Sequence, residues 1–264
     1  MSREWMTVLT MLLGLAWPGL AAAQADCTWP AGMPMRALVL VGEVHGTVET
    51  PALVGALACA AAADTTPVTV ALEMDAAEQT RVDAYLASAG TASDRGALLA
   101  GRFWSRRMQD GRSSVAMAAL IERLRRLRRD GHAIEVVAVD SAGVADRDAA
   151  MAANIRRATR REGARVIALL GNRHASQHKD GQNNPANVPA GVLLADLQPL
   201  SVRVEATQGS AWVCAPACGV LNFGGPATAA VPQPGRYAAG SPRPGYDGIY
   251  TLAALTASPP VQMP

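Results

Sequence analysis

Four short apolar runs, each ending at a polar side chain, constrain the fold of this chain most strongly. They cover residues 38–41, 68–72, 134–139 and 165–170, and aliphatic and β-branched residues dominate them. Nearly continuous apolar runs of this length are typical of strands that are buried on both faces. Because helical patterns lie between them, we expect an α/β fold: a mostly parallel central sheet, helices on both faces, and extra C-terminal strands.

The segments between and after these runs indicate where the other elements lie. Helices are expected over residues 51–63, 76–88, 114–129 and 147–162. Thr50 before Pro51 resembles a helix N-cap, and Asp75 with Glu78 resembles a capping box. Further along, a half-exposed strand is expected at 201–205, a partner strand at 211–213, a Gly- and Pro-rich loop over 222–246 and a last strand within 246–252.

Length and composition suit one globular domain over residues 26–264. The chain has 264 residues, is 50% apolar and carries a formal net charge of +2. A chain of this size can bury a core without staples. Its near-neutral charge and its 4% aromatic content argue against nucleic acid as a partner.

The first 25 residues resemble a secretory signal peptide. Arg3 supplies a basic start, residues 6–20 are apolar, and Ala23 and Ala25 form a small-x-small cleavage pattern. The apolar run is shorter than the roughly 20 residues that span a bilayer. We therefore expect a periplasmic or secreted protein without a stable membrane anchor, with an uncleaved anchor as the alternative.

The four cysteines are expected to form disulfides in an exported chain. Cys214 and Cys218 lie in a Cys-Ala-Pro-Ala-Cys turn, which leaves Cys27 and Cys59 as the other pair. Four cysteines allow three connectivities, so this pairing is a preference.

Polar side chains follow each of the four apolar runs. Glu43 and His45 follow the first run, Glu73 the second, Asp140 the third, and His174 comes shortly after the fourth. Carboxyl ends of parallel strands meet at one edge of a sheet, where ligands bind. An ordinary turn explains Asp140 well, whereas a histidine after a buried strand has no routine structural task.

Two chemistries fit these side chains. Glu43, His45, Glu73 and His174 could hold a divalent metal ion, such as zinc, with an open position for water. Without a metal, the same residues could perform general acid–base hydrolysis. Arg112 is a candidate partner for substrate charge or an oxyanion, with a structural salt bridge as the alternative.

Several well-known catalytic motifs are absent from the sequence. It contains no Gly-x-Ser-x-Gly, no His-Glu-x-x-His, no phosphate-binding Gly-x-x-x-x-Gly-Lys and no dinucleotide fingerprint. His132, in an Asp-Gly-His turn, and His178, in a polar loop, are weaker candidates than the two histidines after strands.

Three short motifs resemble one known superfamily. They are Gly42-Glu43-Val44-His45-Gly46, Ala71-Leu72-Glu73-Met74 and Gly171-Asn172-Arg173-His174-Ala175. Their pattern, over about residues 37–178, resembles the superfamily of erythromycin esterases, ChaN-like haem-binding lipoproteins and Tiki-type proteases.

The resemblance implies an α/β fold with a pocket built from these motifs. In the hydrolase branches, Glu43, His45, Glu73 and His174 match positions tied to water activation or metal binding. In the ChaN-like branch the related fold binds haem. The expected function is therefore an exported hydrolase that acts on an ester or amide bond of a small molecule or peptide, with or without a bound metal. The alternative is a non-catalytic protein that binds haem or a metal.

Overall fold

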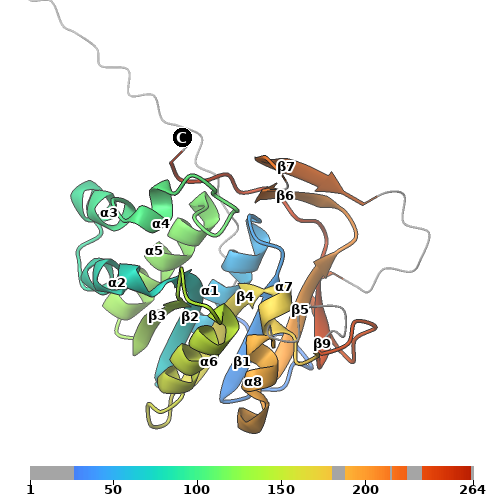
Figure 1. Ribbon diagram of the computed structural model, residues 1–264. Coiled ribbons are helices and arrows are strands. Elements are labelled where there is room, and N and C mark those ends of the chain that lie inside the picture. Colours follow the sequence, from blue (N-terminus) through green and yellow to red (C-terminus); the bar gives the residue numbers. More distant parts are fainter. Residues whose placement is uncertain (1–26, 180–187, 215, 225–233, 263–264) are drawn as a thin grey trace, which may run out of the picture.

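A seven-stranded, mostly parallel sheet forms the centre of the protein (Figure 1). The computed structural model describes residues 27–179, 188–214, 216–224 and 234–262. The sheet order is β3-β2-β4-β1-β5-β9-β8, and every neighbouring pair is parallel except β8 with β9. The strands are β1 (Leu38–Glu43), β2 (Val68–Asp75), β3 (Ile134–Asp140), β4 (Arg165–Gly171), β5 (Leu200–Ala206), β8 (Arg236–Ala239) and β9 (Gly248–Leu252). The predicted fold class is confirmed.

Helices cover both faces of this sheet (Figure 1). One face packs against α1 (Glu49–Ala61), α2 (Gln79–Leu86) and α5 (Val115–Arg129), and the other against α6 (Arg147–Ala158), α7 (Asn172–Ala175) and α8 (Ala190–Leu193). Strand β1 shows the alternation that divides the two cores. Its Val39 and Val41 enter the first cluster, and Leu38 and Leu40 enter the second.

The predicted helices occur, but two of their caps differ. Helix α1 begins at Glu49, after a Val48 N-cap without a side-chain hydrogen bond, so the predicted Thr50 cap is wrong. The Val48 N–H instead donates to Thr256 O, which holds the chain at this point. Asp75 does cap the 3₁₀ turn Ala76–Glu78 that precedes α2.

Two short helices lie between α2 and α5, where no helix was predicted. They are α3 (Ala92–Leu99) and α4 (Arg102–Ser105), and α3 carries a capping box formed by Thr91 and Asp94. Glu78 does not complete a box with Asp75, because its Oε1 accepts the Phe103 N–H at 3.0 Å. The start of α2 is thereby tied to α4.

The predicted pairing of residues 201–205 with 211–213 is wrong. Strand β5 lies between β1 and β9, so both of its edges are already hydrogen-bonded within the main sheet. Its Leu200, Val202 and Val204 are buried in the core. Strand β6 (Gly209–Cys214) turns away and pairs with β7 (Cys218–Phe223) in a separate antiparallel hairpin. Strands β7 and β8 were not predicted, whereas the last strand was.

Both preferred disulfides are present. Cys27–Cys59 ties the segment before β1 to α1, and Cys214–Cys218 closes the β6–β7 hairpin. Such bonds fit a protein of an oxidising compartment. Within the described residues, no helix is both long and apolar enough to cross a membrane. The predicted signal peptide lies outside the described residues.

Candidate functional site

The carboxyl ends of β3, β2, β4 and β1 lie next to one another in the sheet. Parallel register brings Glu43, at the end of β1, beside Gly171 at the end of β4. Asp140, at the end of β3, is in register with the end of β2. The polar side chains that follow the four apolar runs therefore gather at one sheet edge, as the sequence predicts.

Glu73 lies at the centre of this group and is buried. Its Oε1 accepts hydrogen bonds from Arg112 Nη1 at 3.0 Å and Arg147 Nη2 at 2.6 Å, and its Oε2 accepts the Gly171 N–H at 2.7 Å. Burial raises the pKa of this carboxyl, but the charge and hydrogen bond of His45 and the charge of Arg112 outweigh burial and hold the pKa well below its usual range. Glu73 is therefore a fixed negative charge.

His45 lies between two carboxylates. Its Nδ1 is 2.9 Å from Glu43 Oε1, and its Nε2 is 3.5 Å from Glu73 Oε1. Burial opposes protonation of the ring, but the charge of Glu73 and the Glu43 hydrogen bond outweigh it and raise the pKa of His45 to about 10. Burial also raises the pKa of Glu43, whose Oε2 is enclosed without a hydrogen-bond partner among the described residues. His45 is therefore an imidazolium at neutral pH.

His174 has different neighbours. Its Nδ1 is 2.7 Å from Asp148 Oδ1, and its Nε2 is 3.2 Å from Arg147 Nη1. A guanidinium can only donate, so Nε2 accepts, and the ring proton lies on Nδ1 and is donated to Asp148. The Ala190 N–H also donates to Asp148. Burial raises the pKa of Asp148, but the His174 hydrogen bond outweighs it and lowers that pKa. In this arrangement the Nε2 lone pair of His174 faces the Arg147 guanidinium.

The two histidines face one oxygen atom. Glu73 Oε1 lies 3.5 Å from His45 Nε2 and 3.8 Å from His174 Nε2. The Glu73 carboxylate thus connects the two imidazole rings. Gly171 leaves room for this arrangement, since a Cβ there would approach His45 Nε2 to 2.9 Å.

Arginines surround the other side of Glu73. Arg112 binds Asp110 through Nε and Nη2, and its Nη1 lies 3.0 Å from Asp140 Oδ2. Arg147 binds the same Asp140 through Nε and Nη2, at 2.5 and 2.7 Å. Arg106 Nη2 binds Asp110 at 2.5 Å. Arg112 thus makes the structural ion pairs that were its alternative role, yet it stays beside the proposed reacting groups.

Sequence reasoning missed Arg147 and Asp148. Both lie in the first turn of α6, directly after the Asp146 cap, where charged residues are common and carry no special signal. Asp140 does make the turn expected of it, since its Oδ1 accepts the Ser141 N–H, but it also binds two arginines. The order of the strands, which the sequence does not state, brings these residues to Glu73.

His132 and His178 do not have comparable surroundings. His132 Nδ1 lies 3.3 Å from Ala62 O at the start of β3, which is the opposite end of the strand from Asp140. His178 is exposed, and its backbone N–H donates to Ser176 Oγ.

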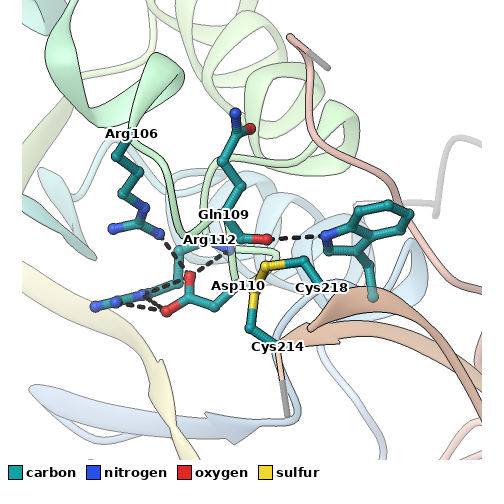
Figure 2. The surroundings of a disulfide bond; sticks show 7 residues. Arg106, Gln109, Asp110, Arg112, Cys214 and Cys218 are labelled. Atoms are coloured by element: carbon teal, nitrogen blue, oxygen red, sulfur yellow. Dashed lines mark hydrogen bonds and ion pairs between the residues drawn. A yellow bond between two sulfur atoms is a disulfide. The ribbon is translucent and has the colours of Figure 1, made fainter. Parts of the chain in front are cut away.

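The β6–β7 hairpin supports the loop that carries Asp110 and Arg112 (Figure 2). Trp212 Nε1 donates to Gln109 O at 2.8 Å. The Trp212 N–H donates to Gly46 O at 2.9 Å, directly after His45. Gly111 has a φ of +88°, and a Cβ there would approach Gly46 Cα to 2.3 Å. The backbones of three segments far apart in the sequence, at Gly46, Gly111 and Trp212, therefore lie in contact beside the site.

The C-terminal segment 255–261 closes over the same region. Ser258 N–H donates to Gly46 O, and Ser258 Oγ accepts the Ala116 N–H at the start of α5. Val261 N–H donates to Ser113 O. This segment therefore holds the loop that carries Gly46 and the residues that lead from Arg112 into α5.

A cleft of about 950 Å³ opens from the arginine side of the site. Its inner wall includes Arg112, Asp140 and Arg147, and its outer wall comes from α2, α4 and the start of the loop after β3. It gives a substrate access to the two arginines that bind Glu73.

The four predicted metal ligands do not form an arrangement suited to a divalent cation. Both oxygens of Glu73 are occupied by donors, and two guanidinium groups already neutralise it. His174 Nε2 is occupied as well, because Arg147 Nη1 lies in hydrogen-bond distance of it. In the parts of the chain that the structure describes, no group of three or more histidine, cysteine and carboxylate side chains is placed to hold a metal ion. Metal binding stays a prediction that this geometry does not support.

Comparison with solved structures shows that the fold is shared with other proteins. A succinoglycan biosynthesis protein matches with a TM-score of 0.58 and 10% identity, over 84% of this chain and 89% of that chain. A Bacillus cereus protein matches with a TM-score of 0.59 and 10% identity, over 85% and 90%. An erythromycin esterase, EreC, in its open conformation matches with a TM-score of 0.52 and 11% identity, over 71% and 76%.

These identities establish a common fold and nothing finer. The predicted resemblance to erythromycin esterases is therefore confirmed for the fold. No protein-family model matches the chain, and a search of curated proteins finds no match.

Proposed function

We propose that the protein is a hydrolase that adds water to an ester or amide bond, with His174 as general base and His45 as general acid. The observation that carries this proposal is the contrast between the neighbours of two histidines beside one carboxylate oxygen. Enzymes obtain an acid and a base at one pH by giving two titratable groups contrasting surroundings. The shared fold with an esterase is consistent with this chemistry.

The proposed reaction gives each of these groups a role. His174 Nε2 takes a proton from water, while Asp148 stabilises the resulting imidazolium. The water oxygen attacks the carbonyl carbon, and the carbonyl oxygen becomes an oxyanion beside Arg112 and Arg147. The C–O or C–N bond then breaks, and the His45 Nε2 proton passes to the leaving oxygen or nitrogen.

Substrate binding must release His174 Nε2 from its present contact. Arg147 occupies that atom through Nη1, and its side chain is one-third exposed toward the cleft. An oxyanion that binds Arg147 would draw the guanidinium away from the imidazole. Glu73, within 4 Å of both Nε2 atoms, is placed to help return the proton from His174 to His45 after each turnover.

The test is hydrolysis of a panel of p-nitrophenyl esters and peptide amides by the purified protein. We expect His45→Gln and His174→Gln each to lower kcat by about 10²–10⁴-fold, the usual contribution of acid–base catalysis. His132→Gln, which changes a histidine outside the site, should retain native rates. Native rates in both site variants, or no turnover of any substrate by the native protein, would overturn the proposal.

Two parts of the expected function remain separate proposals. Haem binding is implied by the resemblance alone, and haemin titration tests it: a Soret shift that is lost in His45→Gln or His174→Gln would support it. Export is proposed from the N-terminal pattern and fits the two disulfides. If it is correct, the mature protein recovered from a bacterial host should lie in the periplasmic fraction and begin at Asp26.

A further inference from the structure

The cleft beside the site carries more positive charge than its own carboxylates neutralise. Arginines outnumber carboxylates on its walls by six to three: Arg81, Arg102, Arg106, Arg107, Arg112 and Arg147 against Asp75, Glu78 and Asp140. A concave surface with one dominant sign of charge concentrates ligands of the opposite sign.

Four of the six arginines are already paired. Each of them lies within 4 Å of a carboxylate, and the pairs are Arg112 and Arg147 with Asp140, Arg106 with Asp110, and Arg81 with Glu78. The remaining carboxylate of the wall, Asp75, caps the turn before α2 by accepting the Ala77 N–H. The surplus of positive charge therefore lies elsewhere.

Arg102 and Arg107 supply that surplus. Both are exposed and lie on the cleft wall, Arg102 at the start of α4 and Arg107 just after its end. Among the residues that the structure describes, neither has a carboxylate within ion-pair distance. Between them, Phe103 and Trp104 are buried, and Arg106 lies 4.7 Å above the Phe103 ring, so α4 is anchored to the core while its two outer arginines face solvent.

We infer that the substrate carries an anionic oxygen group, such as a phosphate, sulfate or carboxylate, which Arg102 and Arg107 bind at the outer end of the cleft. This inference rests on the proposed hydrolase function, since it assigns the substrate class of the same site. Guanidinium groups donate paired hydrogen bonds that match the oxygens of such groups. The bond to be hydrolysed then lies at the inner end of the cleft, beside Arg112 and Arg147.

The kinetic test compares two p-nitrophenyl esters of equal length, one ending in a carboxylate and one in its methyl ester. We expect the native protein to prefer the anionic ester. Arg102→Gln with Arg107→Gln should raise KM for the anionic ester by about tenfold with little change in kcat, because contacts remote from the reacting bond contribute uniform binding. The neutral ester should be unaffected.

A matched control removes the same charge elsewhere. Arg128→Gln with Arg157→Gln changes two exposed arginines on α5 and α6 that do not line the cleft. We expect this control to keep the native preference for the anionic ester. If the two double variants behave alike, the inference is overturned, while hydrolysis itself stands.

A binding test decides the inference independently of turnover. Calorimetric titration with inorganic phosphate, sulfate and succinate should show binding that weakens with added salt and is lost in the Arg102→Gln/Arg107→Gln variant. The ranking of the three probes identifies the preferred anionic group. Equal binding by the cleft variant and the control overturns the inference, even if the protein hydrolyses no ester and the proposed function fails.

Discussion

The two histidines of the site are chemically identical side chains with different neighbours. His45 has a carboxylate at each ring nitrogen, whereas the Nε2 of His174 lies closer to the Arg147 guanidinium than to the Glu73 carboxylate. A carboxylate can only accept a hydrogen bond and a guanidinium can only donate one. The neighbours therefore assign the protons, and the order of strands and the first turn of α6 determine the neighbours.

The charge of His45 predicts an alkaline limit to activity. A general acid must be protonated, so kcat/KM should fall as pH rises through about 10, the pKa of His45 in the folded protein. Glu43→Gln should move this limb to lower pH, because the hydrogen bond and charge of Glu43 help to raise that pKa. A pH–rate profile of each variant measures the shift.

The control for this profile is Asp196→Asn, which removes a surface carboxylate that pairs with Arg156. Its alkaline limb should coincide with that of the native protein. An unchanged limb in Glu43→Gln would show that His45 is not the acid that titrates there.

Asp148 is predicted to be a positioning residue that acts through His174. In Asp148→Asn, the side-chain amide can donate to Nδ1, so the ring proton moves to Nε2 and the base is lost. We expect kcat to fall by about 10²–10⁴-fold. The melting temperature of the variant should stay within a few degrees of that of the native protein. The readout is kcat together with the pH–rate profile.

Asp146→Asn provides the matched control two residues earlier. Asp146 caps α6, and asparagine is an equally good cap, so this variant should keep native kcat. If both variants lose activity equally, the effect belongs to the start of the helix and not to the proton on His174.

At the scale of elements, the loop that carries Arg112 depends on a close backbone contact. In Gly111→Ala, the new Cβ would clash with Gly46 Cα. Residue 111 also has a positive φ, which strains any residue with a Cβ. We expect a loss of about 2–4 kcal/mol in the free energy of unfolding and a disproportionate loss of activity, because Arg112 is the next residue. Urea unfolding and ester hydrolysis measure the two effects.

Gly131→Ala separates contact from backbone strain. Gly131 also has positive φ, at +97°, but a Cβ there would have no neighbour within 4 Å. This variant should cost only about 1–2 kcal/mol and leave activity intact. Equal effects at the two glycines would contradict the importance of the contact.

The sequence predicts the elements that bury apolar runs and fails where pairing depends on distant strands. Strands β1 to β4 were predicted because each is a short, nearly continuous apolar run. The partner of β5 was predicted wrongly because its Leu200, Val202 and Val204 alternate equally well beside β6 or beside β1.

Some residues of the candidate site could likewise be predicted from the sequence, and others could not. Glu43, His45, Glu73 and His174 follow the apolar runs and could be recognised, and the structure brings them together. Arg147 and Asp148 could not, because a charged first turn is normal for a helix. Their contacts with Glu73 and His174 arise only in the folded sheet.

At the scale of the whole molecule, the Cys27–Cys59 disulfide is predicted to contribute more to stability than Cys214–Cys218. The two bonds span sequence separations of 32 and 4 residues. Loop-closure entropy gives about 3–4 kcal/mol for the longer loop and about 2 kcal/mol for the shorter one. Paired cysteine-to-serine variants, unfolded in urea, measure the difference.

The shorter disulfide should instead affect activity, since its hairpin holds the loop beside Arg112 (Figure 2). Reducing both bonds in the native protein should reproduce the sum of the two serine variants. A larger stability loss from Cys214→Ser/Cys218→Ser would contradict the entropic ranking.

The segment 255–261 also sets an order of events in time. It follows every strand of the sheet in the chain, yet its Ser258 holds Gly46, just after β1, and the start of α5. A growing chain can pair β1 to β4 long before this segment exists, but the loops around Arg112 stay untied until it arrives. The pairing of β1 to β4 can therefore come early in folding, whereas β8, β9 and a working site are completed later.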